Sequence, residues 1–103
     1  MEHWRRTMQG HAAANVLPVI AANRFGLESV SPCPENGKQS SSLNFYGSSF
    51  LTDATGALTA QAGRTGEAVL TATYDLDALL QERLIWGLFR DRRPDCYGAI
   101  AGV

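Results

Sequence analysis

The chain has 103 residues, of which 45% are hydrophobic and 18% charged, and its net charge at pH 7 is -1. This length and composition are typical of at most one globular domain with a modest core, or of a piece of one, and they exclude a disordered or fibrous chain. Because there is no excess of positive charge to neutralise phosphates, we expect neither nucleic acid nor a membrane surface as a partner.

The sequence contains no targeting or cross-linking signal. No stretch reaches the roughly 18 apolar residues of a membrane span, and no apolar run follows Arg5 and Arg6 as it would in a secretory signal. Two cysteines, Cys33 and Cys96, make no disulfide framework. We therefore predict a cytoplasmic chain with free thiols.

Residues 2–15 are predicted to form a helix. Trp4, Met8 and Ala12 recur at every fourth position, so they lie along one stripe of that helix. Pro18 cannot continue a helix and disfavours helical geometry in the residue before it. The helix is therefore expected to end just before this proline.

The next segments are a strand and a loop. Residues 16–22 are continuously apolar, which predicts a strand covered on both faces and ending by Gly26. Residues 28–43 are rich in Ser, Pro, Gly and Asn, which predicts a variable loop or a long irregular hairpin.

Three strand-like runs follow, at residues 45–53, 57–63 and 67–75. The first two are joined by a turn in which Asp53 and Gly56 suit the first and last positions of type I. Because apolar residues occur on both alternating faces of these runs, we expect both sides of the sheet to be covered.

A second helix is predicted after Asp75, which is a good N-cap. Its leucines have amphipathic spacing: Leu76, Leu79, Leu80 and Leu84. Residues 86–103 form an irregular tail that keeps large apolar side chains, and we expect this tail to pack against something.

These elements predict an α+β fold with about four strands and two helices, with the helices on one face of the sheet. The opposite face has nothing left in the chain to cover it. Residues 1–103 are therefore interpreted as a single incomplete domain.

The residues that could carry chemistry are few. Cys33, Glu35 and Lys38 could act as nucleophile, base and cationic stabiliser, but a loop rich in Pro and Gly gives them no rigid frame. A metal site is not expected, because His3 and His11 are too far apart on one helix to share an ion. No cofactor is expected either.

Asn23 and Arg24 lie at the end of the predicted strand 16–22. Strand ends are where sites occur in sheets of this type. Two interpretations of Asn23 stay open: a structural residue of a turn and a residue of a substrate pocket.

Three segments together resemble a known family. They are HWRRTMQGHAAANVLPVIAANRFG, FYGSSFLTDATG and DLDALLQERLIWGLFRDRRPDCYG, and they occur in order over residues 2–98. They resemble the C-terminal third of amidases of the nitrilase (carbon–nitrogen hydrolase) superfamily, in which Asn15, Asn23 and Arg24 match a fold signature. Ala54 departs from the proline that is common in that family's turn.

The resemblance implies part of a four-layer α-β-β-α sandwich, and a reaction that hydrolyses a carbamoyl amide to amine, carbon dioxide and ammonia. The family's catalytic glutamate, lysine and cysteine lie upstream of the segment that begins at His3. None of them carries over to Cys33, Cys96 or Lys38. We therefore expect the chain alone to be inactive, as a truncated gene product, a fragment or a domain remnant.

The resemblance also implies an assembly surface, because the matching helix contributes to a dimer interface and the tail crosses toward a partner subunit. The residues expected there are Trp4, Arg5, Met8, Trp86, Phe89 and Arg90. Three hypotheses stay open: an incompetent piece of an amidase, a module that self-associates or binds a homologous subunit, and a free-standing thiol enzyme using Cys33.

Overall fold

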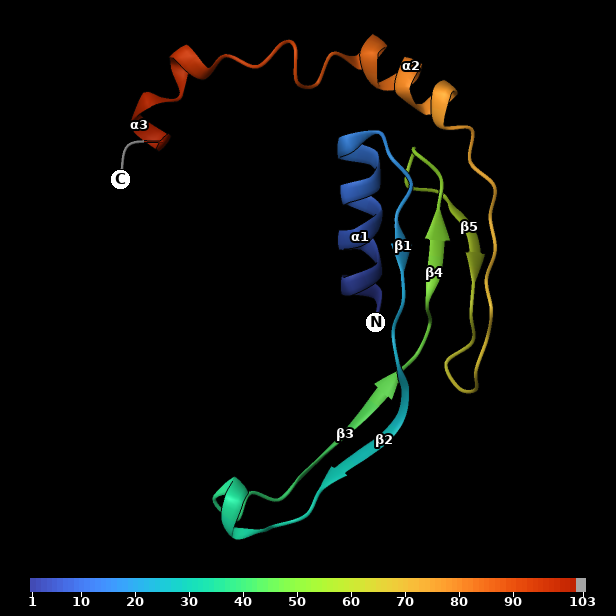
Figure 1. Ribbon diagram of the computed structural model, residues 1–103, viewed down its shortest axis with the longest axis vertical. Helices are drawn as coiled ribbons and strands as arrows, with labels where there is room; N and C mark the ends of the chain where they lie inside the picture. Colours follow the sequence, from blue (N-terminus) through green and yellow to red (C-terminus); the bar gives the residue numbers. More distant parts are fainter. Residues whose placement is uncertain (102–103) are drawn as a thin grey trace. The chain divides into compact units, whose positions relative to one another are not determined.

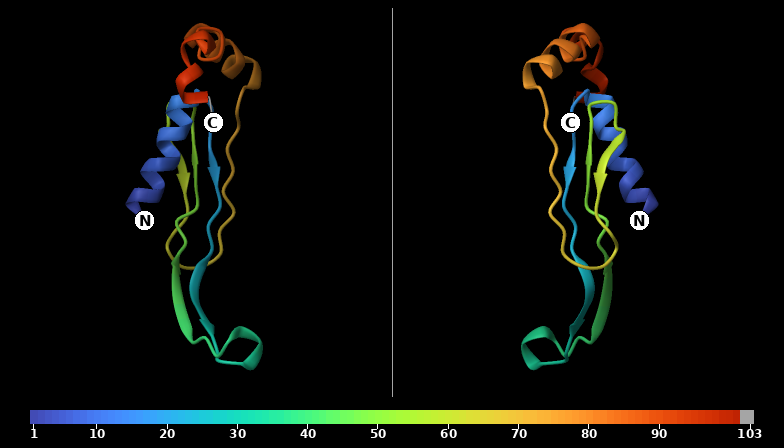
Figure 2. Two further views of the ribbon diagram at one scale, coloured as in Figure 1. Left: turned by 90° about the vertical axis from the view of Figure 1, so that its left-hand side faces the viewer. Right: turned by 90° about the vertical axis from the view of Figure 1, so that its right-hand side faces the viewer.

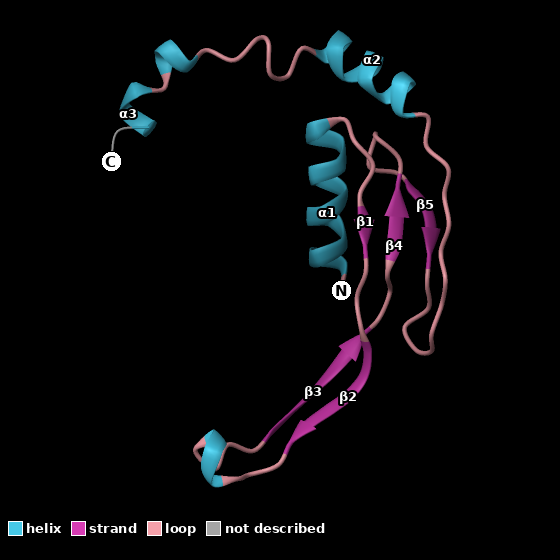
Figure 3. Ribbon diagram, in the orientation of Figure 1, coloured by secondary structure: helices cyan, strands magenta, loops and turns pink. Residues whose placement is uncertain are grey.

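The computed structural model describes residues 1–101, and it separates into two compact units, Met1–Thr73 and a second that begins at Tyr74. The first unit contains one long helix and two antiparallel sheets (Figures 1 and 3). Its elements are α1 (Glu2–Asn15), β1 (Ile20–Ala21), β2 (Phe25–Val30), β3 (Ser41–Tyr46), β4 (Phe50–Thr52) and β5 (Leu58–Gln61). The predicted α+β class is confirmed, with five strands in place of about four.

Helix α1 has the predicted bounds. It ends where Val16 adopts a left-handed conformation with φ of 50°, which lets the N–H groups of Val16 and Leu17 bond the carbonyls of Ala13 and Ala12. The Asn15 side chain donates to the His11 carbonyl at 2.9 Å. The chain thus leaves the helix ahead of the proline, as expected.

The main sheet has the order β1-β4-β5, with β4 in the centre. Phe50 and Leu51 point to opposite faces of β4, and both are buried. The expectation of two covered faces is therefore confirmed at this strand. Helix α1 lies on one side of the strands and the extended segment 67–73 passes on the other (Figure 2).

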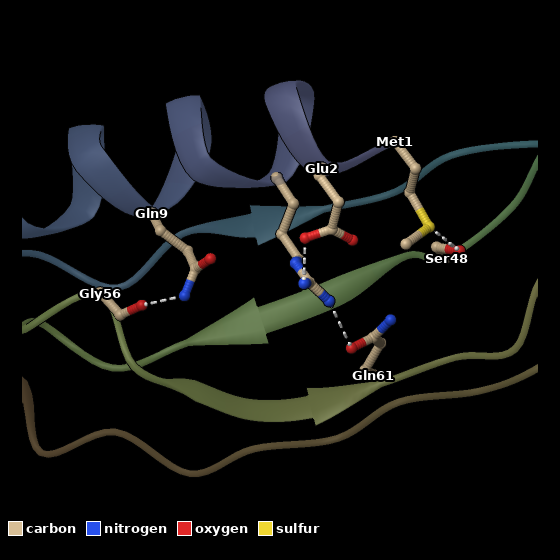
Figure 4. A network of polar contacts seen from close by, with 7 residues as sticks. Met1, Glu2, Gln9, Ser48, Gly56 and Gln61 are labelled. Carbon is tan, nitrogen blue, oxygen red and sulfur yellow. Dashed lines mark hydrogen bonds and ion pairs between the residues drawn. The ribbon is translucent and has the colours of Figure 1, made fainter.

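Contacts between α1 and the sheet are aromatic and polar. The ring of Trp4 meets Phe50 edge-on, with centroids 5.1 Å apart. Arg5 forms an ion pair with Glu2 and donates to the Gln61 side chain of β5 (Figure 4). These contacts hold the helix in one position over β4 and β5.

The tight turn between β4 and β5 forms as predicted. The Gly56 N–H donates to the Asp53 carbonyl at 3.2 Å. The Asp53 carboxylate accepts from the Thr55 N–H and hydroxyl and from the Ala57 N–H. These bonds, the one from the Thr55 hydroxyl most of all, lower the pKa of Asp53.

Two strand predictions are wrong: the strand at 16–22 is much shorter than expected, and the strand at 67–75 is absent. Within 16–22 the only strand is β1, at Ile20–Ala21, and Ile20 is 72% exposed, so this strand is not covered on both faces. Residues 67–75 form no strand, and Val69 is 91% exposed. β-branched residues favour a strand only where a neighbour offers a packing surface, and this segment runs beside the sheet without forming a strand.

The segment 28–43, expected as a variable loop or a long irregular hairpin, forms the greater part of a hairpin, so the second of these expectations is confirmed. Strands β2 and β3 pair from Phe25 opposite Tyr46 to Val30 opposite Ser41. Gly26, expected to end the first strand, lies inside β2. A short 3-10 helix, Pro34–Asn36, forms the tip.

The second unit contains α2 (Leu76–Trp86), a 3-10 turn at Pro94–Cys96 and α3 (Gly98–Ala101). Asp75 caps α2 as predicted, since its side chain accepts from the Ala78 N–H at 2.9 Å. No residue of α2 is buried. None of the described helices is both long enough and apolar enough to cross a membrane.

Candidate functional site

Hydrogen bonds around Asn23 join the segment that follows β1 to the segment that precedes β4. Its side-chain amide donates to the Gly47 carbonyl at 2.8 Å, and its side-chain oxygen accepts from the Arg24 N–H at 3.0 Å. Its backbone N–H and carbonyl both bond the Ser49 hydroxyl, at 2.9 and 3.1 Å. One asparagine therefore fixes the crossing point from which the hairpin β2–β3 departs.

Gly47 and Ser48 adopt an unusual backbone at this crossing. Both have positive φ, 57° and 62°, and a Cβ on Gly47 would come within 2.9 Å of the Arg64 carbonyl oxygen. Ser48 is 2% exposed, its N–H donates to the Gly63 carbonyl, and its hydroxyl donates to the Tyr46 carbonyl. A left-handed backbone is strained in a serine, and it persists only where the surrounding contacts hold the residue in that conformation.

A pocket of about 280 Å³ lies at this strand end, and we call it the strand-end pocket. It is formed by three stretches of the first unit: Asn23, Arg24, Phe25, Gly47, Ser48, Ser49, Ala62, Gly63, Gly66, Glu67 and Ala68. Three separate connections meet there, so it is a concave site that could accept a small ligand.

Two charged side chains line the strand-end pocket. Arg24 is held by Glu28, 3.0 Å from its guanidinium, and by the ring of Phe45, whose centroid lies 3.7 Å from the guanidinium carbon. Glu67 is the other; it is exposed to solvent, and within residues 1–101 it has no hydrogen-bond or ion-pair partner.

The predicted pocket residue Asn23 does line this pocket. The nitrogen and the oxygen of its side chain are both bonded to backbone groups, so Asn23 also fits the other interpretation, that of a structural residue. Contact between Asn23 and a substrate stays a prediction.

The Cys33, Glu35 and Lys38 cluster lies at the hairpin tip and lines no part of the strand-end pocket. Hydrogen bonds from its own backbone N–H and from the Cys33 thiol lower the pKa of the Glu35 carboxyl. Both Glu35 and Lys38 are exposed, so the tip offers them no pocket in which to hold a substrate. In the described part of the chain no three His, Cys, Asp or Glu side chains are grouped to hold a metal ion.

The three residues of α1 expected at a subunit interface are half-buried against the chain itself. Trp4 contacts Phe50 and also Tyr46, with ring centroids 5.9 Å apart in the latter pair. Arg5 is bonded to Glu2 and Gln61, and Met8 is half-buried. Their role in a subunit interface stays a prediction.

The other three expected interface residues lie in the second unit. Trp86 is 64% exposed and Phe89 is 59% exposed. Arg90 forms an ion pair with Asp91, which lies 2.7 Å away. The guanidinium groups of Arg83 and Arg92 lie over the Phe89 ring. The interface prediction for these residues also stays untested within one chain.

Sequence reasoning missed Ser48, Ser49 and Glu67. The segment YGSSF was interpreted as a strand with a close-packed glycine; the close packing is confirmed, but residues 47–49 lie between strands. The sequence did contain a signal for the break between β3 and β4: a glycine followed by two serines, residue types that favour turns, interrupts a run of strand formers. Nothing in the local sequence marks Glu67, because it is brought to the pocket by the turn after β5.

Comparison with known proteins identifies the relatives of this fold. The carbon–nitrogen hydrolase family model matches residues 1–83. The chain is 50% identical over 99 residues to a citrullinase of Francisella tularensis, covering 96% of this chain and 32% of the relative. It is 51% identical over 96 residues to an N-carbamoylputrescine amidase of Arabidopsis thaliana, covering 93% and 31%.

A solved structure agrees. The crystal structure of a carbon–nitrogen hydrolase from Helicobacter pylori matches with a TM-score of 0.72 and 37% identity, covering 96% of this chain and 32% of that one. The chain therefore spans about a third of the length of the relatives it matches.

Proposed function

The chain belongs to the carbon–nitrogen hydrolase family, and from that premise we propose that it is the C-terminal third of a cytoplasmic amidase of polyamine biosynthesis whose substrate is N-carbamoylputrescine. The family resemblance expected from the sequence motifs is confirmed. The activity is proposed for the whole enzyme, because the chain covers a third of its relatives.

The observation that carries the proposal is the identity of 48–52% to four plant N-carbamoylputrescine amidases across 93% of this chain. The citrullinase is 50% identical. The substrates in these two names share a terminal ureido group, in which a carbonyl carbon joins two nitrogens. We infer that the common reaction is hydrolysis at that carbon.

In the proposed reaction, water adds to the carbonyl carbon and both carbon–nitrogen bonds break. The products are the amine, carbon dioxide and ammonia, and the atoms of one water and one ureido compound account for all of them. The family resemblance assigns attack to a cysteine, proton transfer to a glutamate and stabilisation of the intermediate to a lysine. All three belong to the upstream two thirds, so this chain supplies the strand-end pocket and the packing surface around it.

A chimera tests this proposal. The N-terminal two thirds of the Arabidopsis N-carbamoylputrescine amidase is joined to this chain, and ammonia release is measured with N-carbamoylputrescine and with citrulline. We expect turnover by the chimera and none by this chain or by the N-terminal part alone. A folded chimera without turnover on either compound would contradict the proposal.

The free-standing thiol enzyme is tested by the same assay. Turnover by this chain alone that disappears in Cys33→Ser would place the nucleophile at the hairpin tip and overturn the assignment above.

A second candidate function is a non-catalytic module that self-associates or binds a homologous subunit. The exposure of Trp86 and Phe89 supports it, because large aromatic side chains are enriched at interface cores. Light scattering tests it: the module predicts a discrete oligomer that Trp86→Ala with Phe89→Ala converts to monomer. A monomeric native chain that also fails to bind a homologous subunit would contradict it.

A further inference from the structure

We propose that the strand-end pocket binds the cationic end of the substrate, the end remote from the ureido group, and that Glu67 is the residue that binds it. This inference rests on the proposed function and makes it more specific. It selects N-carbamoyl amines that end in an ammonium group over those that carry a carboxylate there.

The charge of the pocket lining points to a cation. The positive charge of Arg24 is paired with Glu28, and its guanidinium face is covered by Phe45. The charge of Glu67 has no partner among the described residues. Glu28, which pairs with Arg24, does not itself line the pocket; the exposed carboxylate of Glu67 is the negative charge of the lining that is available to a ligand.

The uncharged polar side chains of the pocket are already bonded. The Ser48 hydroxyl donates to the Tyr46 carbonyl, and the Ser49 hydroxyl donates to the Asn23 carbonyl. The Asn23 side chain is bonded through both its nitrogen and its oxygen. This leaves two lining side chains for a ligand: the guanidinium of Arg24, which can only donate, and the Glu67 carboxylate, which when ionised can only accept and is therefore the group that can bind an ammonium.

Size and position agree with a small substrate. A volume of about 280 Å³ is at the lower limit of ligand pockets, which start near roughly 300 Å³. The pocket lies at the end of the sheet where β1 ends and β4 begins. A short aliphatic amine fits these limits.

The same charge discriminates between the substrates of the two named relatives. N-carbamoylputrescine ends in an ammonium group alone, whereas citrulline carries a carboxylate beside its ammonium group. Glu67 attracts the first and repels the carboxylate of the second. Glu67 is thus assigned as a specificity residue, in contact with the part of the substrate that does not react.

A binding experiment on this chain tests the assignment without any turnover. The chain labelled with nitrogen-15 is titrated with N-carbamoylputrescine and with butylurea, which has the same ureido group and chain length but no ammonium group. We expect N-carbamoylputrescine to shift the amide signals of Ser48, Gly63 and Gly66, and Glu67→Gln to weaken this binding about three- to fivefold, as for one exposed ion pair. Glu35→Gln at the hairpin tip is the matched control and should change nothing.

Equal binding of butylurea, no shift at the pocket, or binding unaffected by Glu67→Gln would overturn the assignment. Kinetics of the chimera give the second readout. There, Glu67→Gln should raise the KM for N-carbamoylputrescine about three- to fivefold with little change in kcat, and should reduce the preference over citrulline. If the chimera is active and Glu67→Gln leaves its kinetics unchanged, only the role of Glu67 is refuted. If the chimera is inactive, the proposed function is refuted, and the titration alone then tests whether the pocket binds the ammonium group.

Discussion

Helix α2 has the stronger local helix signals, whereas helix α1 has the better packing. Helix α2 has a side-chain N-cap at Asp75, an acidic residue in its first turn and a left-handed Gly87 at its end. Helix α1 has no side-chain cap. Yet α1 buries Ala12 completely and contacts Phe50 through Trp4, whereas α2 buries no residue. Local signals thus establish that a helix forms, and only a neighbouring surface makes it part of a core.

Among the substitutions that test this difference between the helices, Phe50→Ala should have the largest effect on stability. Phe50 of β4 is fully buried and packs against Trp4 of α1, so truncation should lower the free energy of unfolding of the first unit by about 3–5 kcal/mol. The urea midpoint measured by circular dichroism reports it. A loss below about 1 kcal/mol would mean that α1 does not depend on this contact.

Next in size is Gly56→Ala. Gly56 has a φ of 84°, and an added Cβ would lie 2.6 Å from the Gln9 carbonyl oxygen of α1. Strain and the clash with backbone should together cost about 2 kcal/mol or more. Gly66→Ala is the matched control, because Gly66 has a φ of 85° with no atom within 4 Å. Equal losses in the two variants would show that the approach to α1 contributes nothing.

A moderate effect is expected from Asp75→Ala at the start of α2. Loss of the bond to the Ala78 N–H should destabilise this helix by about 1 kcal/mol, seen as roughly fivefold faster amide exchange in its first turn. The first unit should keep its urea midpoint. A change in that midpoint would mean that α2 contributes to the same core as α1.

A smaller, pH-dependent effect is expected from Asp53→Asn in the turn beside α1. Because the folded pKa of Asp53 is lowered, chiefly by the Thr55 hydroxyl, its contribution is present above the unfolded pKa of about 3.9 and is lost as pH falls through the folded pKa. The variant should lose about 0.5 kcal/mol at pH 7 and show a flatter decline of stability in acid. Urea midpoints at pH 7 and pH 3 measure both, and parallel declines in the two proteins would refute the assignment.

The smallest effect is expected from Leu80→Ala in α2. Leu80 is 53% exposed, so stability should change by less than about 0.5 kcal/mol, measured by amide exchange in α2 at low protein concentration. A larger loss of stability that grows with protein concentration would contradict this expectation. It would mean that α2 is buried in an assembly and is therefore part of a core, as α1 is.

The sequence alone determined the features that depend on neighbours along the chain. The bounds of α1, the Asp75 cap of α2 and the turn from Asp53 to Gly56 were all predicted correctly, because each is set by bonds within a few residues. The sequence motifs also identified the family. Asn23 was singled out, although its position at a strand end could not distinguish a structural residue from a pocket residue.

Only the tertiary structure decided the rest. The apolar run 16–22 gives a strand of two residues, and 67–75 forms no strand. For 28–43 the structure decides between the two expected forms, a loop and an irregular hairpin, in favour of a paired hairpin. Strand pairing joins residues distant in sequence, so it depends on which partner edge is available and not on propensity. The strand-end pocket has the same cause: Asn23, Ser48 and Glu67 come from three separate connections, and backbone bonds across the sheet bring them together.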